Sequence, residues 1–248
     1  MLILLHGFTD TTRTWELVLP RLAAEHDVLV PALPGHLGGP PLPAELGRDT
    51  LPDAVERAMD DAGIEAAHLA GNSLGAYVAL QLAELGRARS VVAFAPAGGW
   101  VSERELHETL DFFVETNRLV RRSAPHADAI AATPAGRRSI TQYVTVRHEH
   151  LPVDLVAHLL VGAAACDALP LIELARREGY RLDPERITCP VRIVWGTEDA
   201  VLPWPSAAAR YREAWLPHAD WVELEGVGHC PQLDVPLESA ELILDFTR

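Results

Sequence analysis

The chain has 248 residues, a hydrophobic fraction of 48% and a formal net charge of −14 at pH 7. This length fits one α/β domain with insertions, and the hydrophobic content is ample for a large core. The strong negative charge argues against non-specific binding to nucleic acid phosphates.

The remaining composition points to an unanchored intracellular protein. No apolar run has the length of a membrane span, and the first residues lack the basic and apolar regions of a signal peptide. The three cysteines are widely spaced, as expected of reduced thiols. All 21 basic residues are arginine, which excludes lysine-dependent catalysis. We therefore expect a cytoplasmic monomer or homodimer that binds neither membranes nor nucleic acid.

The first part of the chain alternates short apolar runs with amphipathic ones. The apolar runs predict buried parallel strands at 2–5, 28–30, 66–70 and 91–95. The amphipathic runs predict helices at 14–25, 49–62 and 76–85, and Pro20 should bend or split the first of them. Strands that alternate with helices predict a parallel sheet covered on both faces.

From Pro96 the pattern changes to helices alone. Ser102 and Glu105 form a capping box before a long helix that ends near residue 122, and further helices are expected at 124–131, 134–144 and 152–169. Strands return at 191–195 and 221–224, with helices at 205–215 and 235–246. We therefore predict an α/β core made of residues 1–97 and 187–248, with an all-helical cap or lid over residues 98–186.

The most informative motif is Gly71-Asn72-Ser73-Leu74-Gly75, which lies between a predicted strand and a predicted helix. A serine between two glycines at such a junction is typical of a nucleophile elbow, where a tight turn exposes the hydroxyl. Small residues are needed because the turn packs backbone against backbone. Ser73 is therefore the candidate nucleophile.

Two later loops supply a base and an acid for that serine. Gly196-Thr197-Glu198-Asp199 follows the strand at 191–195, and Gly226-Val227-Gly228-His229 follows the strand at 221–224. Side chains at the carboxyl ends of parallel strands meet where open α/β sheets bind ligands. His229 is the candidate base, and Asp199 is preferred to its neighbour Glu198 as the orienting acid.

A fourth loop, His6-Gly7-Phe8-Thr9-Asp10, follows the first strand. Backbone amides placed there can stabilise the negative oxygen of a tetrahedral intermediate. By position, the donors are the amides of Phe8 and Leu74, and the Leu74 amide also opens a helix whose dipole helps.

These loops, together with Pro34-Gly35-His36, resemble the α/β-hydrolase superfamily over nearly the whole chain. The resemblance implies a mostly parallel sheet flanked by helices. Members usually begin with a two-strand hairpin before the oxyanion strand, whereas Met1 here adjoins that strand. We therefore expect the sheet to lack the hairpin.

Four further residues are candidates for substrate binding. His36 could lie near the mouth of the pocket, and Trp100 could line it. Residues 118–147 hold six arginines and one acid; if Arg118 and Arg122 turn inward, they would favour an anionic substrate.

The combination predicts a serine hydrolase that cleaves a small ester, lactone or thioester through an acyl-enzyme on Ser73. Neither a metal nor a cofactor is expected, since His148 and His150 have no third ligand in register. An aspartate nucleophile would have implied dehalogenase or epoxide hydrolase chemistry, and the serine argues against both.

Three alternatives use the same fold. Carbon–carbon bond hydrolases resemble the chain at Gly71-Asn72-Ser73 but typically have a tryptophan after the histidine, where this chain has Cys230. The pyruvate-eliminating synthase of menaquinone biosynthesis resembles it at His6-Gly7-Phe8 but has an arginine where Tyr77 stands. A receptor that binds a small hydrophobic ligand with little or no turnover is the third.

Overall fold

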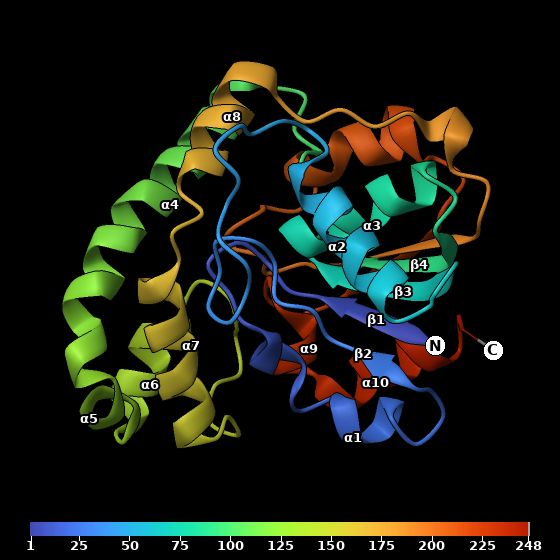
Figure 1. Ribbon diagram of the computed structural model, residues 1–248. Helices are drawn as coiled ribbons and strands as arrows, with labels where there is room; N and C mark the ends of the chain where they lie inside the picture. The colour runs from blue at the N-terminus through green and yellow to red at the C-terminus, as the bar shows by residue number, and fades with distance from the viewer. Residues whose placement is uncertain (248) are drawn as a thin grey trace.

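The computed structural model describes residues 1–247, which form a twisted parallel sheet flanked by helices (Figure 1). The sheet has six strands in the order β2-β1-β3-β4-β5-β6, and every neighbouring pair is parallel. The strands are β1 (Leu2–Leu5), β2 (Val28–Leu29), β3 (Ala67–Asn72), β4 (Ala88–Phe94), β5 (Val191–Gly196) and β6 (Asp220–Leu224). The predicted parallel sheet is confirmed, and it has no antiparallel hairpin within the described residues.

Helices cover both faces of the sheet (Figure 1). On one face, α2 (Thr50–Asp61) and α3 (Leu74–Glu84) cover a core that includes Ile3, Leu5 and Trp195. The other face packs on a second core formed with α1 (Leu19–Leu22), α9 (Pro231–Asp234) and α10 (Pro236–Leu244). Because both faces are buried, β1 is apolar throughout and β4 is apolar over residues 91–94.

Two predicted helices are broken in the structure. The predicted helix at 14–25 is a 3₁₀ turn, η1 (Thr12–Trp15), followed by the single turn α1, which has Pro20 in its first turn. Proline lacks the N–H that would continue a preceding helix, which explains the split. The predicted helix at 205–215 is likewise a 3₁₀ turn, η4 (Ser206–Ala208), and a π-helical turn, η5 (Tyr211–Trp215).

The residues between β4 and β5 contain helices and no strand within the described part of the chain, as predicted. We call residues 98–186 the helical segment; it lies beside the sheet in Figure 1. Its helices are α4 (Glu103–Ser123), η2 (Ala124–His126), α5 (Ala127–Ala131), α6 (Pro134–Thr141), α7 (Val153–Ala165), α8 (Pro170–Glu178) and η3 (Pro184–Arg186). The sequence prediction missed α8, which Pro170 opens after a break that follows Ala165.

Among residues 1–247, no single helix is long and apolar enough to cross a membrane. The helices α7 and α8 meet the length and composition criterion only when taken together, and they are bent by 68° at the break between them.

The helical segment contacts the core where α7 crosses the turn before η1. A β-carbon added to Gly162 would lie 2.1 Å from Cγ2 of Thr11, and both residues are buried. The Thr11 hydroxyl also accepts a hydrogen bond from the Arg13 amide, so this side chain is held in place. The absence of a side chain at position 162 therefore sets how closely α7 approaches the core.

Gly162→Ala tests this close approach. Alanine favours the helix by up to about 1 kcal/mol, but overpacking of a buried contact costs about 1–3 kcal/mol, so we expect a net loss of stability. Thermal unfolding should show a melting temperature lowered by a few degrees. The double variant Thr11→Ser/Gly162→Ala removes the opposing methyl group and keeps the hydroxyl, and it should recover most of the loss. A Gly162→Ala protein as stable as the wild type would contradict the close contact.

Candidate active site

Ser73 occupies the turn between β3 and α3 with φ 55° and ψ −116°, a conformation that L-residues rarely adopt. Its amide donates to the Phe94 carbonyl at 2.9 Å. A β-carbon on Gly71 would lie 2.4 Å from the Gly75 oxygen, and one on Gly75 would lie 2.3 Å from the Leu5 oxygen. The two glycines therefore allow the backbone contacts that hold the serine in this strained turn.

Asp199 and His229 form a buried pair at the ends of β5 and β6. The Asp199 Oδ2 lies 2.8 Å from the His229 Nδ1, and both side chains are almost fully buried. The other carboxylate oxygen accepts the amides of Val201 and Leu202 at 2.9 and 2.7 Å. These bonds orient the imidazole so that its Nε2 is free to take a proton. Glu198, the rival acid, is exposed.

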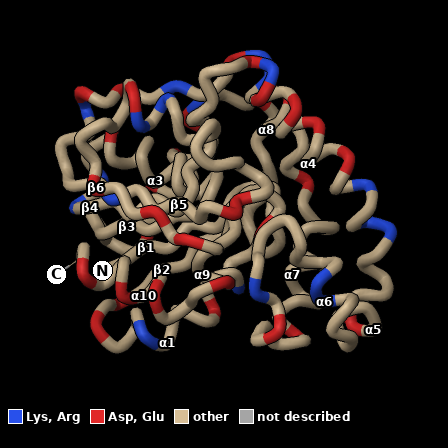
Figure 2. The backbone as a smooth tube through the Cα atoms, turned by 180° about the vertical axis from the view of Figure 1, so that it is seen from behind, with Lys and Arg blue, Asp and Glu red and all other residues tan. Residues whose placement is uncertain are grey.

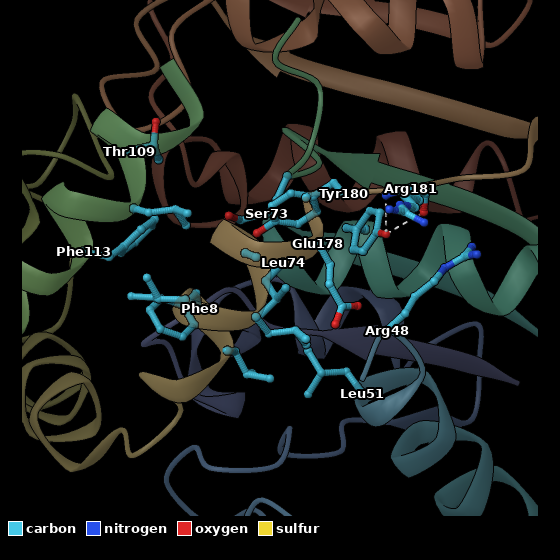
Figure 3. Close-up of a pocket in the computed structure, with 18 of the residues that line it drawn as sticks. Phe8, Arg48, Leu51, Ser73, Leu74, Thr109, Phe113, Glu178, Tyr180 and Arg181 are labelled. Carbon is cyan, nitrogen blue, oxygen red and sulfur yellow. Dashed lines mark hydrogen bonds between the residues drawn. The ribbon is translucent and has the colours of Figure 1, made fainter. Parts of the chain in front are cut away.

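Two cavities meet at Ser73, and Figure 3 shows the first of them. The Tyr77 cavity, about 210 Å³, has Leu51, Tyr77, Trp100 and Tyr180 in its wall. The His229 cavity, about 270 Å³, has Asp10, His229, Leu159 and Leu160 in its wall. Phe8 and Phe113 lie between them, with ring centroids 5.2 Å apart and planes nearly perpendicular. The hydroxyl of Ser73 is thus accessible from two mostly apolar spaces.

The loop after β1 presents the predicted oxyanion donors. Phe8 lines both cavities, and Leu74 is the first residue of α3, where helix amides are unpaired and the dipole favours a negative charge. Neither amide donates to an acceptor within residues 1–247. Both therefore remain able to bind a ligand oxygen beside Ser73.

Two buried histidines hold this loop. The Nε2 of His6 accepts the Leu33 amide at 3.0 Å, and the Nε2 of His36 accepts the Thr9 amide at 3.2 Å. Their Nδ1 atoms donate to the carbonyls of Gly7 and Pro34. Burial lowers the pKa of His6 to about 3 and that of His36 to about 4. Both rings are therefore neutral and act as rigid braces for the loop.

This arrangement decides between the two roles open to His36, a place near the mouth of the pocket and a structural role in a turn. His36 is buried and lies outside the walls of both cavities at Ser73, so it is not a substrate contact. Its ring packs against His6 and Phe8, with centroids 4.9 and 5.8 Å away. A side chain whose two ring nitrogens are bonded within the protein has no atom left for a substrate.

Of the remaining candidate substrate contacts, Trp100 lines a cavity and the two arginines do not. Trp100 is buried in the wall of the Tyr77 cavity, as the prediction required. Arg118 and Arg122 are exposed on α4 and line neither cavity, so the inward orientation that their role as substrate contacts required is not found. Figure 2 shows basic positions of α4 along the outer side of the helical segment. The arginines that do line the Tyr77 cavity are Arg48, which pairs with Glu84, and Arg181.

Sequence reasoning missed two side chains that fix the His229 loop. The buried Asp234 carboxylate accepts the amides of Gly228 at 2.7 Å, Val146 at 3.0 Å and Arg147 at 2.7 Å, which ties the helical segment to this loop. Asn72, within the elbow motif, donates to the His229 carbonyl at 2.9 Å. A carboxylate five residues after the histidine, before a helix, was the available signal for Asp234.

Comparison with known proteins agrees with this geometry. A family model described as the alpha/beta hydrolase family matches residues 2–242. An epoxide hydrolase, EphH of Mycobacterium tuberculosis, is 31% identical over 79% of this chain and 92% of its own. A pimeloyl-[acyl-carrier protein] methyl ester esterase of Aromatoleum aromaticum is 27% identical over 100% of this chain and 98% of its own.

A solved structure with a similar fold is a bacterial membrane phospholipase A, with a TM-score of 0.77 and 26% identity. The match covers 99% of this chain and 77% of that one. These three similar proteins are named as an epoxide hydrolase, a methyl ester esterase and a phospholipase, whereas a relative from Pseudomonas putida, 29% identical over 100% of this chain and 63% of its own, is named as an acetyltransferase component.

Asp234→Asn tests the tie between the helical segment and the His229 loop. The amide group would place an N–H against a backbone N–H, so at least one buried hydrogen bond is lost and stability should fall by about 1–3 kcal/mol. Urea denaturation measures the change, and Glu238→Gln, at an exposed position on α10, is the control that should leave stability unchanged. Equal stability of Asp234→Asn and the control would rule out the tie.

The neutral state of His36 predicts a pH dependence of stability. The unfolded imidazole binds a proton below its ordinary pKa of 6.5, whereas the folded one does so only near pH 4. Stability is therefore lost as the pH falls through this window, by up to about 1.4 kcal/mol per pH unit. In His36→Gln this loss should disappear, so its free energy of unfolding should fall less steeply between these pH values than that of the wild type. If the free energy of unfolding fell equally steeply with pH in the two proteins, His36 would not be held neutral in the folded state.

Proposed function

The chain belongs to the α/β-hydrolase family, and its relatives include an epoxide hydrolase and a methyl ester esterase; we propose that it is a serine hydrolase acting through an acyl-enzyme on Ser73. The observation that supports this best is the buried Asp199–His229 pair, 2.8 Å apart, beside a cavity that Ser73 and His229 both line. The substrates are small esters, lactones or thioesters.

Each group has a distinct task in this reaction. His229 removes the proton from the Ser73 hydroxyl through Nε2, while Asp199 holds Nδ1 and stabilises the imidazolium. The serine oxygen adds to the carbonyl, and the amides of Phe8 and Leu74 bind the resulting oxyanion. His229 then protonates the leaving group, and afterwards activates a water molecule that releases the acid.

The serine also separates this chain from epoxide chemistry. When a carboxylate opens an epoxide, the product is an ester, whose carbonyl water can attack. When a serine hydroxyl opens an epoxide, the product is an ether, which has no carbonyl for water to attack. Ser73 would therefore be blocked after one turnover, so the likeness to EphH supports a hydrolase without an epoxide substrate.

We propose further that the helical segment acts as a cap that selects the substrate. Its helices α4 and α8 supply Thr109, Leu110 and Ile172 to the Tyr77 cavity, and α6 and α7 supply walls of the His229 cavity. The substrate we expect is uncharged in its acyl part, because Arg118 and Arg122 face away, Arg48 is paired with Glu84, and Arg181 shares the wall of the Tyr77 cavity with Glu178. A cytoplasmic location and a monomeric or homodimeric state stay predictions.

Covalent labelling of Ser73 tests the proposed mechanism. A fluorophosphonate should label the wild-type protein and leave Ser73→Ala unlabelled, because the probe needs an activated serine. On nitrophenyl esters of increasing acyl length, Ser73→Ala should lose about 10⁴-fold or more in kcat. An unlabelled wild type that turns over no ester would overturn the proposal. Turnover of a 2-hydroxy-6-oxo dienoate alone would favour the carbon–carbon hydrolase alternative.

A further inference from the structure

Asp10 is a carboxylate in the active-site region that the proposed reaction does not use. It follows Phe8 in the loop after β1 and lines the His229 cavity together with Ser73 and His229. Its Oδ1 accepts the Thr11 amide at 2.8 Å, which fixes the side chain. The cavity therefore has a fixed carboxylate in its wall, whereas Asp199 bonds the Nδ1 side of the imidazole and lines neither cavity.

The charge of Asp10 has no basic partner of its own. Arg13, the nearest arginine in sequence, pairs with Glu16 and Asp154, and no arginine within residues 1–247 forms an ion pair with Asp10. The groups that face it are the Thr14 hydroxyl from η1 and, from the His229 loop, the His229 ring and the Cys230 thiol. Burial raises the pKa of Asp10 to about 6, so the carboxylate is still ionised at neutral pH.

The position of His229 decides which part of an ester meets this charge. The leaving oxygen must receive its proton from His229, so the leaving group has to lie beside that ring. His229 lines the cavity that contains Asp10 and is not in the wall of the Tyr77 cavity. The leaving group therefore occupies the His229 cavity, and the acyl group occupies the Tyr77 cavity, next to Leu74.

We propose that Asp10 selects the charge of the leaving group, favouring cationic over neutral and neutral over anionic ones. This inference rests on the proposed serine hydrolase function. A fixed negative charge in a partly desolvated cavity attracts a cation and repels an anion more strongly than the same charge in water would. The Tyr77 cavity has no such negative bias, because Glu178 shares its wall with Arg181 and with Arg48, which pairs with Glu84.

Three butyrate esters of similar size test the proposal. One has choline as the leaving group, the second has the neutral alcohol in which carbon replaces the quaternary nitrogen, and the third has a carboxylate-bearing alcohol. The wild-type enzyme should prefer them in that order in kcat/KM. In Asp10→Asn, which keeps an oxygen to accept the Thr11 amide, the preference for the choline ester over its neutral counterpart should fall about tenfold. The ester with the anionic leaving group should gain relative to the neutral one.

The control is Asp61→Asn, which removes the same charge from an exposed position at the end of α2. It should leave the ratios of kcat/KM unchanged, because only a charge in the cavity acts on the leaving group. If Asp10→Asn hydrolyses the neutral ester but keeps the wild-type ratios, the proposal is wrong while the hydrolase function stands.

Binding supplies a readout that does not depend on turnover. In a Ser73→Ala background, calorimetry should show that the choline ester binds more tightly than its neutral counterpart. Adding Asp10→Asn should remove that difference. Equal binding of both esters to Ser73→Ala would overturn the role of Asp10. A wild type that hydrolyses none of the three esters and takes no fluorophosphonate label would overturn the hydrolase function and this inference together.

Discussion

The contact between Gly75 and the end of β1 is the constraint on which the active-site geometry depends. With the Leu5 oxygen only 2.3 Å from where a β-carbon would lie, α3 begins directly against the backbone of β1. This contact holds the start of α3, with the Leu74 amide, close to the end of β1, where the loop that contains Phe8 begins. It also allows the strained turn at Ser73, a residue that lines both cavities. A larger residue at position 75 would separate the nucleophile from the groups that must stabilise its product.

The loops around Ser73 are held by polar side chains that bond to backbone amides. Asp199 and Asp234 are buried carboxylates that each accept several amides, and His36 accepts one. A buried carboxylate without such donors would be costly, and loops without such acceptors would leave their amides unpaired. Each of these side chains therefore accepts hydrogen bonds from loop amides, and the same bonds compensate for burying the polar side chain. As a result, the catalytic groups are placed before substrate arrives, which oxyanion stabilisation requires.

The sequence predicted the parts of this site that depend on local pattern. Apolar runs located the strands, and residues just after the strands ended up together because parallel strands end at the same edge. The bonds of Asp234 to Val146 and Arg147, and that of Asn72 to His229, could not be placed in the same way, since these partners are distant along the chain. The structure also explains why Arg118 and Arg122 face away. Leu110 and Asn117 are the buried residues of α4, and at 3.6 residues per turn Arg118 and Arg122 lie about 100° and about 140° around the helix from Asn117.

The structure separates the choice of reaction from the choice of substrate. The proposed triad lies at the ends of sheet strands and in their loops, where the backbone bonds described above leave little freedom. Many residues of the cavity walls come from α4, α6, α7 and α8, whose side chains can change without moving the proposed triad. Asp10 lies in the loop after β1, next to the proposed oxyanion donor Phe8, and its side chain lines the His229 cavity. In the proposed mechanism, this one loop would therefore stabilise the transition state through its backbone and discriminate between leaving groups through a side chain.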